Sequence, residues 1–177
     1  MSRIAIPIER LLNRPYDFWE NEWVLLTSGD FESKEYNAMT VAWGSLGCMW
    51  SLPFAQVVVR PTRHTFQFME RYPTFTLCAF GPQHRPALKL LGSRSGRDGD
   101  KIAASGLTPI AATQVAAPAF AEATLILECR KLYWHDFEPS HFLDPQLEKN
   151  YPQRDYHRVY YGEIVAAHGI EAFINNR

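Results

Sequence analysis

The stretch Asn37-Ala-Met-Thr-Val-Ala-Trp43 alternates polar and apolar side chains, which is the pattern of a strand with one buried face. Gly44 follows it, and a residue without a Cβ lets another group approach the backbone. Asn37 and Thr40 offer an amide and a hydroxyl, and Trp43 offers a large flat ring. The strand therefore suits a planar heterocycle, although core packing explains its apolar side chains equally well.

The segments around this strand also favour β structure. Strands are expected at 23–27, 38–43, 56–59, 74–79, 123–133 and 159–166, because these segments are rich in β-branched and aromatic residues and are bounded by Gly, Pro or Asp. Helices are expected at 63–71 with Thr62 as N-cap, at 86–91 ended by Gly92, and at 101–105 between Asp100 and Gly106. Most connections are too short for βαβ crossovers. The expected fold is mainly β, an antiparallel barrel with a few short covering helices.

Length and composition indicate one folded domain, residues 1–177. The chain has 177 residues, of which 46% are hydrophobic and 21% charged, so it can build a sizeable core and is not expected to be disordered. With 18 Lys and Arg against 19 Asp and Glu, it has no general attraction to nucleic acid or acidic lipid. We expect neither as a partner.

Location and redox state follow from what the sequence does not contain. No apolar stretch approaches the roughly 20 residues that a membrane span needs, and the first residues do not resemble a signal peptide. The 3 cysteines include no CxxC pair, so neither a disulfide framework nor a Cys-rich zinc site is expected. A reduced cytoplasmic protein is the resulting expectation.

Two loops are candidates for binding an anion. Arg60-Pro-Thr-Arg-His-Thr65 lies between a buried strand and a helix start, where unpaired N–H donors, two guanidinium groups and two hydroxyls suit a phosphate. The alternative is that Thr62 only caps the helix and the arginines stay solvated. The loop Ser93-Arg-Ser-Gly-Arg-Asp-Gly-Asp-Lys101 is basic and flexible enough to approach an anion, or is simply an exposed polar turn. It lacks the P-loop spacing, and no GxGxxG occurs in the chain.

Other constellations are weak. His135 with Asp136, and His141 with Asp144, lack the spacing of a metal site, so no metal is expected. No G-x-S-x-G motif supports a catalytic serine, and Cys78 and Cys129 are expected to be small core residues. Asp155 and His157 form a pair that could titrate near neutrality, or an exposed hydrogen-bonded pair.

Four pieces in order resemble the flavin reductase-like family, over about residues 23–166. They are Asn37-Ala-Met-Thr-Val-Ala-Trp43, Val57-Val-Val-Arg-Pro-Thr-Arg-His-Thr65, Ser95-Gly-Arg-Asp-Gly-Asp-Lys101 and His157-Arg-Val-Tyr-Tyr-Gly-Glu-Ile-Val165. The resemblance implies a split β-barrel, antiparallel and Greek-key-like, that binds FMN. It also implies a homodimer with the flavin near the subunit interface.

The resemblance assigns expected roles to particular residues. Around the isoalloxazine it implies Asn37, Thr40, the backbone near Ala42, and Trp43. Around the ribityl chain and phosphate it implies Arg60, Thr62, Arg63 and Thr65, with Ser95 and Lys101 completing the anion site. His141 and His157 are further candidates at the edge. No protein nucleophile is assigned, because hydride transfer is carried out by the flavin.

The expected function is that of an NAD(P)H-dependent flavin reductase or related FMN oxidoreductase, which passes hydride through flavin to free flavin or another small acceptor. Two alternatives stay open: a flavoredoxin-like electron carrier with protein redox partners, and a barrel without flavin that serves as a binding module. The sequence does not indicate whether NADH or NADPH is preferred, because it contains no Rossmann selector residue.

Overall fold

The computed structural model describes residues 2–12 and 14–175. Its strands are β1 (Ile4–Ala5), β2 (Val24–Asp30), β3 (Glu35–Val41), β4 (Gly44–Met49), β5 (Leu52–Val59), β6 (Thr74–Ala79), β7 (Pro109–Ile110), β8 (Ala119–Phe120), β9 (Leu125–Asp136) and β10 (Arg158–Gly169). Its α-helices are α1 (His64–Arg71), α2 (Arg85–Ser93) and α3 (Lys101–Ser105). Short 3-10 or π turns are η1 (Ile8–Arg10), η2 (Asp17–Asn21), η3 (Pro82–His84), η4 (Gly96–Asp98), η5 (Pro139–His141), η6 (Leu147–Asn150) and η7 (Glu171–Phe173).

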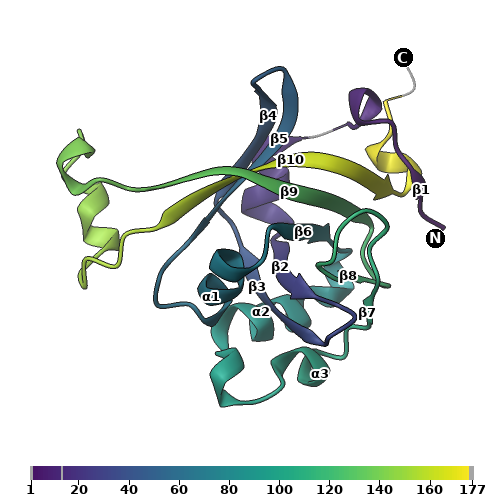
Figure 1. The fold of residues 1–177 in the computed structure, drawn as a ribbon, viewed down its shortest axis with the longest axis horizontal. Coiled ribbons are helices and arrows are strands. Elements are labelled where there is room, and N and C mark those ends of the chain that lie inside the picture. The colour runs from purple at the N-terminus through teal and green to yellow at the C-terminus, as the bar shows by residue number, and fades with distance from the viewer. Residues whose placement is uncertain (1, 13, 176–177) are drawn as a thin grey trace.

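The main sheet is antiparallel and closes on itself at one corner. Its strand order is β3-β2-β6-β9-β10-β5-β4, with β1 paired to β10. β3 and β4 stand at opposite ends of this order, yet only Ala42 and Trp43 separate them in the chain. The sheet therefore curls until its end strands approach one another, which gives an open barrel (Figure 1). This confirms the expected mainly antiparallel barrel.

Two apolar clusters hold the fold. The first gathers buried side chains from one face of the curled sheet with Trp19 of η2 and Met69 of α1. The second lies between the opposite face of the sheet and α2, α3 and β8, with Phe120 at its centre. Gly44 packs against the first cluster, because a Cβ there would lie 2.5 Å from the Trp19 ring. The close approach that this glycine allows is thus made by the protein's own core.

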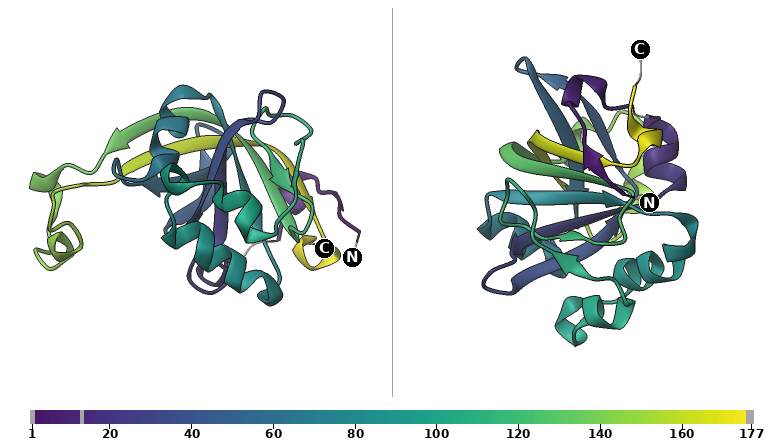
Figure 2. Two further views of the ribbon diagram at one scale, coloured as in Figure 1. Left: turned by 90° about the horizontal axis from the view of Figure 1, so that it is seen from below. Right: turned by 90° about the vertical axis from the view of Figure 1, so that its right-hand side faces the viewer.

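Helices α1 and α2 flank β3, the end strand of the sheet, as Figure 2 shows from two further sides. Thr40 on β3 donates its hydroxyl to the Leu88 carbonyl of α2 at 2.6 Å. The prediction that Gly92 ends α2 is wrong: the helix runs on to Ser93. Where α2 crosses the strand, a Cβ on Gly92 would lie 3.2 Å from Thr40, so this glycine serves close packing.

The predicted caps of α3 and α1 can be compared with the structure. Asp100 accepts hydrogen bonds from the backbone N–H groups of Ile102 and Ala103, and Gly106 ends α3 at φ +73°, so both predicted caps of α3 are confirmed. The prediction that Thr62 caps α1 is wrong. The N-cap is Arg63, and its side chain makes no capping hydrogen bond.

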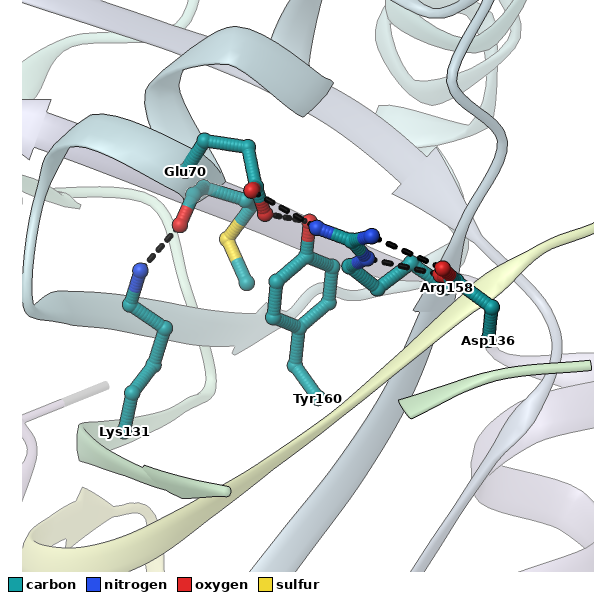
Figure 3. A network of polar contacts seen from close by, with 6 residues as sticks. Glu70, Lys131, Asp136, Arg158 and Tyr160 are labelled. Carbon is teal, nitrogen blue, oxygen red and sulfur yellow. Dashed lines mark hydrogen bonds and ion pairs between the residues drawn. The ribbon is translucent and has the colours of Figure 1, made fainter. Parts of the chain in front are cut away.

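The chain from β9 to β10 forms an arm that projects from the barrel, seen at the left of Figure 1. At its base, Arg158 donates to both carboxylate oxygens of Asp136 (2.7 and 2.8 Å) and to Glu70 of α1 (2.7 Å). The Tyr160 hydroxyl also donates to Glu70, at 2.6 Å. The guanidinium carbon of Arg158 lies 3.6 Å from the ring centroid of Trp134. This network joins the arm to α1 (Figure 3).

Candidate functional site

A hollow at the corner between β3 and β4 gathers four of the expected site residues. It has a volume of about 240 Å³ and is called here the Trp43 hollow. Its lining comprises Met39, Thr40, Val41, Ala42, Trp43, Val58, Arg60 and His157. Trp43 keeps 46% of its surface exposed although it is large and aromatic. A flat ring beside apolar side chains and a strand edge is suited to binding a planar ligand.

His157 forms the far wall of this hollow. Its ring centroid lies 5.1 Å from that of Trp43, and its Nδ1 is 2.8 Å from the Tyr151 hydroxyl. Burial, followed by the positive charge of Arg60, lowers the pKa of His157 to about 4. The imidazole is therefore neutral at pH 7. Both alternatives for Asp155 and His157 are wrong. Asp155 pairs with Arg60 instead, and His157 is buried, which keeps its pKa well below neutrality.

The buried imidazole predicts a pH dependence of stability. The folded-state pKa of His157 is about 4 against an ordinary value of 6.5, so the unfolded chain binds more protons between these values. The free energy of unfolding should therefore fall by about 3 kcal/mol as the pH drops through that window. Urea unfolding at a series of pH values measures this. His157→Gln should flatten the change, whereas His141→Gln on the exposed arm should keep it; an unchanged slope in His157→Gln contradicts the account.

Arg60 anchors the arm rather than standing free. Its guanidinium donates to both oxygens of Asp155 at 3.0 Å and to the Asn150 carbonyl at 2.7 Å. It also lies over the Tyr151 ring, 4.9 Å from the centroid. The hydrogen bonds from Arg60 lower the pKa of Asp155. The charge of Arg60 is thus balanced within the protein, and its main contacts fix one rim of the Trp43 hollow.

Arg63 differs from Arg60 because no carboxylate balances it in the described part of the chain. Its guanidinium donates to the Gly92 carbonyl at the end of α2. Burial, followed by the repulsion of Arg60, lowers its pKa. A half-buried cation without an acidic partner is costly unless an anion is supplied from outside. Arg63 is therefore the group in this loop most suited to an anionic ligand.

The loop after α2 packs against the loop before α1, so the two loops predicted to bind an anion lie side by side. Arg97 donates to the Thr62 carbonyl at 3.2 Å. Ser95 accepts from the Arg97 backbone N–H at 3.2 Å, so its hydroxyl caps η4. Gly96 sits so close to β3 that a Cβ would lie 2.4 Å from Asn37 Oδ1. The two loops meet at the edge of β3.

Asn37 and Lys101 lie on the other side of that meeting point. Asn37 Nδ2 donates to Thr65 Oγ1 at 2.7 Å, and both residues are buried. Lys101 is buried too, and its ammonium donates to the carbonyls of Leu91 (2.9 Å) and Arg94 (3.1 Å). Burial, followed by the charge of Arg63, lowers the pKa of Lys101 to about 8. Asn37 and Lys101 line a second hollow of about 440 Å³, the Lys101 hollow.

The expected residues therefore form one neighbourhood with two hollows. Thr40, Ala42, Trp43 and Arg60 line the first hollow, and Asn37 and Lys101 line the second. Thr62, Arg63 and Ser95 lie in the loops that meet between them, and Thr65 lies in the first turn of α1. His141 lies exposed on the arm. Within residues 2–12 and 14–175, no group of His, Cys, Asp and Glu is arranged to hold a metal ion, and no helix is long and apolar enough to cross a bilayer.

Sequence reasoning missed a third hollow beside the first. It has a volume of about 260 Å³, shares Thr40 and Ala42 with the Trp43 hollow, and is bordered by Trp23 and Lys89. Trp23 has φ +58°, which is unusual for a bulky residue, and Arg85 lies 4.6 Å from its ring centroid. No local pattern indicates this hollow, because Trp23 looks in the sequence like the start of an ordinary strand.

The antiparallel split barrel, with basic loops beside an aromatic hollow, defines a class of ligand-binding barrels. A family model described as "Flavin reductase like domain" matches residues 20–175, and the chain belongs to this family. This confirms the resemblance inferred from the four sequence pieces.

Solved structures share the fold at low sequence identity. An FMN-binding domain of a flavin reductase-like enzyme from Shewanella baltica has 18% identity over 95% of this chain and 77% of its own, with a TM-score of 0.68. Flavoredoxin of Desulfovibrio vulgaris has 23% identity over 92% and 74%, with a TM-score of 0.65. An NADH:FAD oxidoreductase of Streptomyces globisporus has 18% identity over 88% and 82%, with a TM-score of 0.65. A comparison with curated proteins finds no match.

Proposed function

We propose that this protein is an FMN-dependent oxidoreductase of the flavin reductase type, which takes hydride from NAD(P)H and passes it to free flavin or another small acceptor. The observation that carries the proposal is the unbalanced Arg63 beside the hollow walled by Trp43 and His157. FMN has the matching shape, a flat ring joined to a phosphate. Membership of the flavin reductase-like family and the FMN-binding neighbour support the same cofactor.

The size and chemistry of the groove fit this cofactor. The Trp43 hollow and the hollow beside Trp23 share Thr40 and Ala42, so together they follow the C-terminal end of β3. Their volumes of about 240 and 260 Å³ adjoin at these two residues. We assign the isoalloxazine to this groove, against Thr40, Ala42 and Trp43. We assign the phosphate to Thr62 and Arg63, with Arg60 holding the rim in place.

Within this proposal, the flavin supplies the hydride chemistry, and the chain binds and orients it. Trp43 covers part of the ring and keeps water from that part. His157 is neutral at pH 7, so it offers a hydrogen bond without adding charge to the hollow. Arg63 stabilises the phosphate, and the neighbouring cations favour negative charge in the groove. No side chain is needed as a nucleophile.

The second candidate is a flavoredoxin-like carrier that exchanges electrons with protein partners. The exposed edge of Trp43 supports it, because a ring with 46% of its surface in solvent leaves the groove open to a partner. The fold that the chain shares with flavoredoxin is in keeping with either function, the reductase or the electron carrier.

The absorption spectrum of purified protein, followed by anaerobic mixing with NADH and NADPH, separates the candidates. We expect a flavin spectrum, or stoichiometric uptake of added FMN, and then saturable bleaching by one or both nucleotides. Bleaching only by a protein donor supports the carrier. Folded protein that takes up no FMN excludes both and leaves the binding module without flavin.

We also propose a homodimer, formed through an aromatic face on the outer side of the sheet. Trp50 and Tyr133 are 57% and 52% exposed, and both pack against Tyr161 at centroid distances of 6.4 and 6.0 Å. Such a large exposed aromatic group is typical of an interface. Sedimentation equilibrium should give a dimer for the native chain and a monomer for Trp50→Glu. A native monomer at micromolar concentration contradicts the proposal.

A cytoplasmic location remains a prediction, in keeping with the free cysteines.

A further inference from the structure

The loop of residues 60–63 carries Arg63, the cation to which the proposed function assigns the phosphate. It is a short connection, because β5 ends at Val59 and α1 begins at His64. A short connection has little freedom once the elements at its two ends are fixed. The direction of the Arg63 side chain therefore depends on how α1 is placed relative to β5.

Arg158 contacts the elements on both sides of this loop. Its backbone lies opposite Val59, the last residue of β5, where β10 and β5 pair. Its guanidinium donates to Glu70 in the last turn of α1 at 2.7 Å, and the guanidinium carbon lies 5.5 Å from the ring centroid of Phe66. Phe66 and Glu70 are four residues apart, so they share one face of the helix. Arg158 thus ties α1 to the strand beside which the loop begins.

The Arg158 guanidinium is itself fixed from its other side. Asp136 accepts two hydrogen bonds from it, while Glu70 accepts one, as Figure 3 shows. The ring of Trp134 lies against the guanidinium, 3.6 Å from centroid to carbon. The planar fork of an arginine can donate to two carboxylates at once in a single geometry, so the side chain has little freedom to turn.

Two further hydrogen bonds reach the last turns of α1 from the same strand pair. The Tyr160 hydroxyl donates to Glu70 at 2.6 Å, and the Lys131 ammonium donates to the Met69 carbonyl. Neither Arg158 nor its two carboxylate partners line the Trp43 hollow. These contacts therefore act on the helix whose start presents the anion-binding loop, and not on a ligand directly.

We propose that Arg158 is a positioning residue for the phosphate: by fixing α1 against β9 and β10, it holds Arg63 in the direction in which Arg63 binds the phosphate of FMN. The proposal rests on the proposed flavin function. A loop that is already ordered loses less conformational entropy when it binds its ligand. Loss of Arg158 should therefore weaken the contact with the phosphate and leave the contact with the flavin ring unchanged.

Amide hydrogen exchange of the apo protein tests the positioning without flavin. The Arg63 amide donates to the Arg60 carbonyl and the Phe66 amide to the Arg63 carbonyl, both at 3.0 Å. We expect Arg158→Met to speed the exchange of residues 60–66 by about tenfold. Arg130→Met is the matched control, because Arg130 pairs with Glu163 across the same two strands, and it should leave this exchange unchanged. Equal exchange in wild type and Arg158→Met overturns the proposal.

Flavin titrations of the same variants test whether Arg63 is the group that is positioned. Arg158→Met should weaken FMN by about three- to tenfold and leave the affinity for riboflavin, which lacks the phosphate, unchanged. In an Arg63→Ala background, Arg158→Met should cause no further loss of FMN affinity, because it acts through Arg63. An equal loss for both flavins, or the full loss in the Arg63→Ala background, shows a general structural role and overturns the proposal.

Glu70→Ala is the second variant, because it removes the ion pair of Arg158 with α1 and leaves the pair with Asp136. It should speed exchange of residues 60–66 and weaken FMN as Arg158→Met does, and it decides the matter alone if Arg158→Met does not fold. Wild-type exchange in Glu70→Ala overturns the proposal. Failure of the flavin function is seen separately, as absence of FMN uptake by wild type, and exchange of the apo protein still tests whether Arg158 orders the loop.

Discussion

Arg63→Ala should weaken the binding of FMN by about 10- to 100-fold. A charge-assisted hydrogen bond to a phosphate contributes about 1.5–3 kcal/mol, and every 1.4 kcal/mol is a factor of ten in affinity. Arg63 has no carboxylate partner in the described chain, so its removal leaves the phosphate without its nearest cation. Quenching of flavin fluorescence during titration of apo protein measures the dissociation constant.

Two controls make this result specific. Arg71→Ala removes the same charge from the other end of α1, where Arg71 pairs with Glu35 at 2.9 Å, and it should leave FMN affinity within twofold. Riboflavin, which lacks the phosphate, should bind wild type and Arg63→Ala equally. An equal loss for riboflavin and FMN would show that Arg63 only holds the end of α2 through Gly92.

Lys101→Met should lower the free energy of unfolding by about 3–4 kcal/mol. The Lys101 ammonium donates to the buried Leu91 carbonyl and to the partly buried Arg94 carbonyl, and a carbonyl that loses its donor in such a place costs about 1–3 kcal/mol. A methionine fills the same volume but donates no hydrogen bond. Urea unfolding at pH 7 measures the change.

The matched control is Lys89→Met, an exposed lysine on α2, which should change the free energy of unfolding by less than 0.5 kcal/mol. If Lys101→Met were as stable as wild type but bound FMN more weakly, the main role of Lys101 would be to bind the phosphate and not to stabilise the fold. The distinction matters because the sequence alone assigns Lys101 to the anion site, whereas its contacts in the fold are with backbone carbonyls.

The elements that were predicted correctly are those whose sequence signals lie within or directly beside the segment itself. Asp100 and Gly106 bracket α3 with standard caps, and both behave as expected. β6 was predicted at its exact bounds, because Thr74–Ala79 is a short β-rich segment between a proline and a glycine-proline pair. The strand predicted at 38–43 is present but shifted, because β3 begins at Glu35 and ends at Val41.

The missed elements depend on contacts that are distant in sequence. β4 contains Gly44 and Gly47 and no β-branched residue, so nothing in its own composition indicates a strand; it forms by pairing with β5. The turn between them uses Trp50 and Ser51 at φ +55° and +60°, where glycine or asparagine is the usual signal. β9 runs on to Asp136 because it pairs with the start of β10 at the base of the arm, and β10 runs on to Gly169 because it pairs there with the start of β9 and with β1.

In the candidate site, too, local features were predictable from the sequence and contacts between distant segments were not. Its residue types and their order in the chain were readable from the sequence, because a basic loop before a helix start is a local feature. The burial of Asn37 and Lys101 was not, because it depends on contacts with Thr65 and with the carbonyls of Leu91 and Arg94. The neutral state of His157 likewise follows from burial beside Arg60, which the sequence does not reveal.

The central claim is that one groove along the edge of β3 holds the flavin, with its ring at Trp43 and its phosphate at Arg63. A crystal structure of the protein grown with excess FMN tests this most directly. We predict the isoalloxazine beside Thr40, Ala42 and Trp43, and a phosphate oxygen within hydrogen-bonding distance of the Arg63 guanidinium. FMN bound with its ring away from that strand edge, or its phosphate away from both anion loops, would contradict the account.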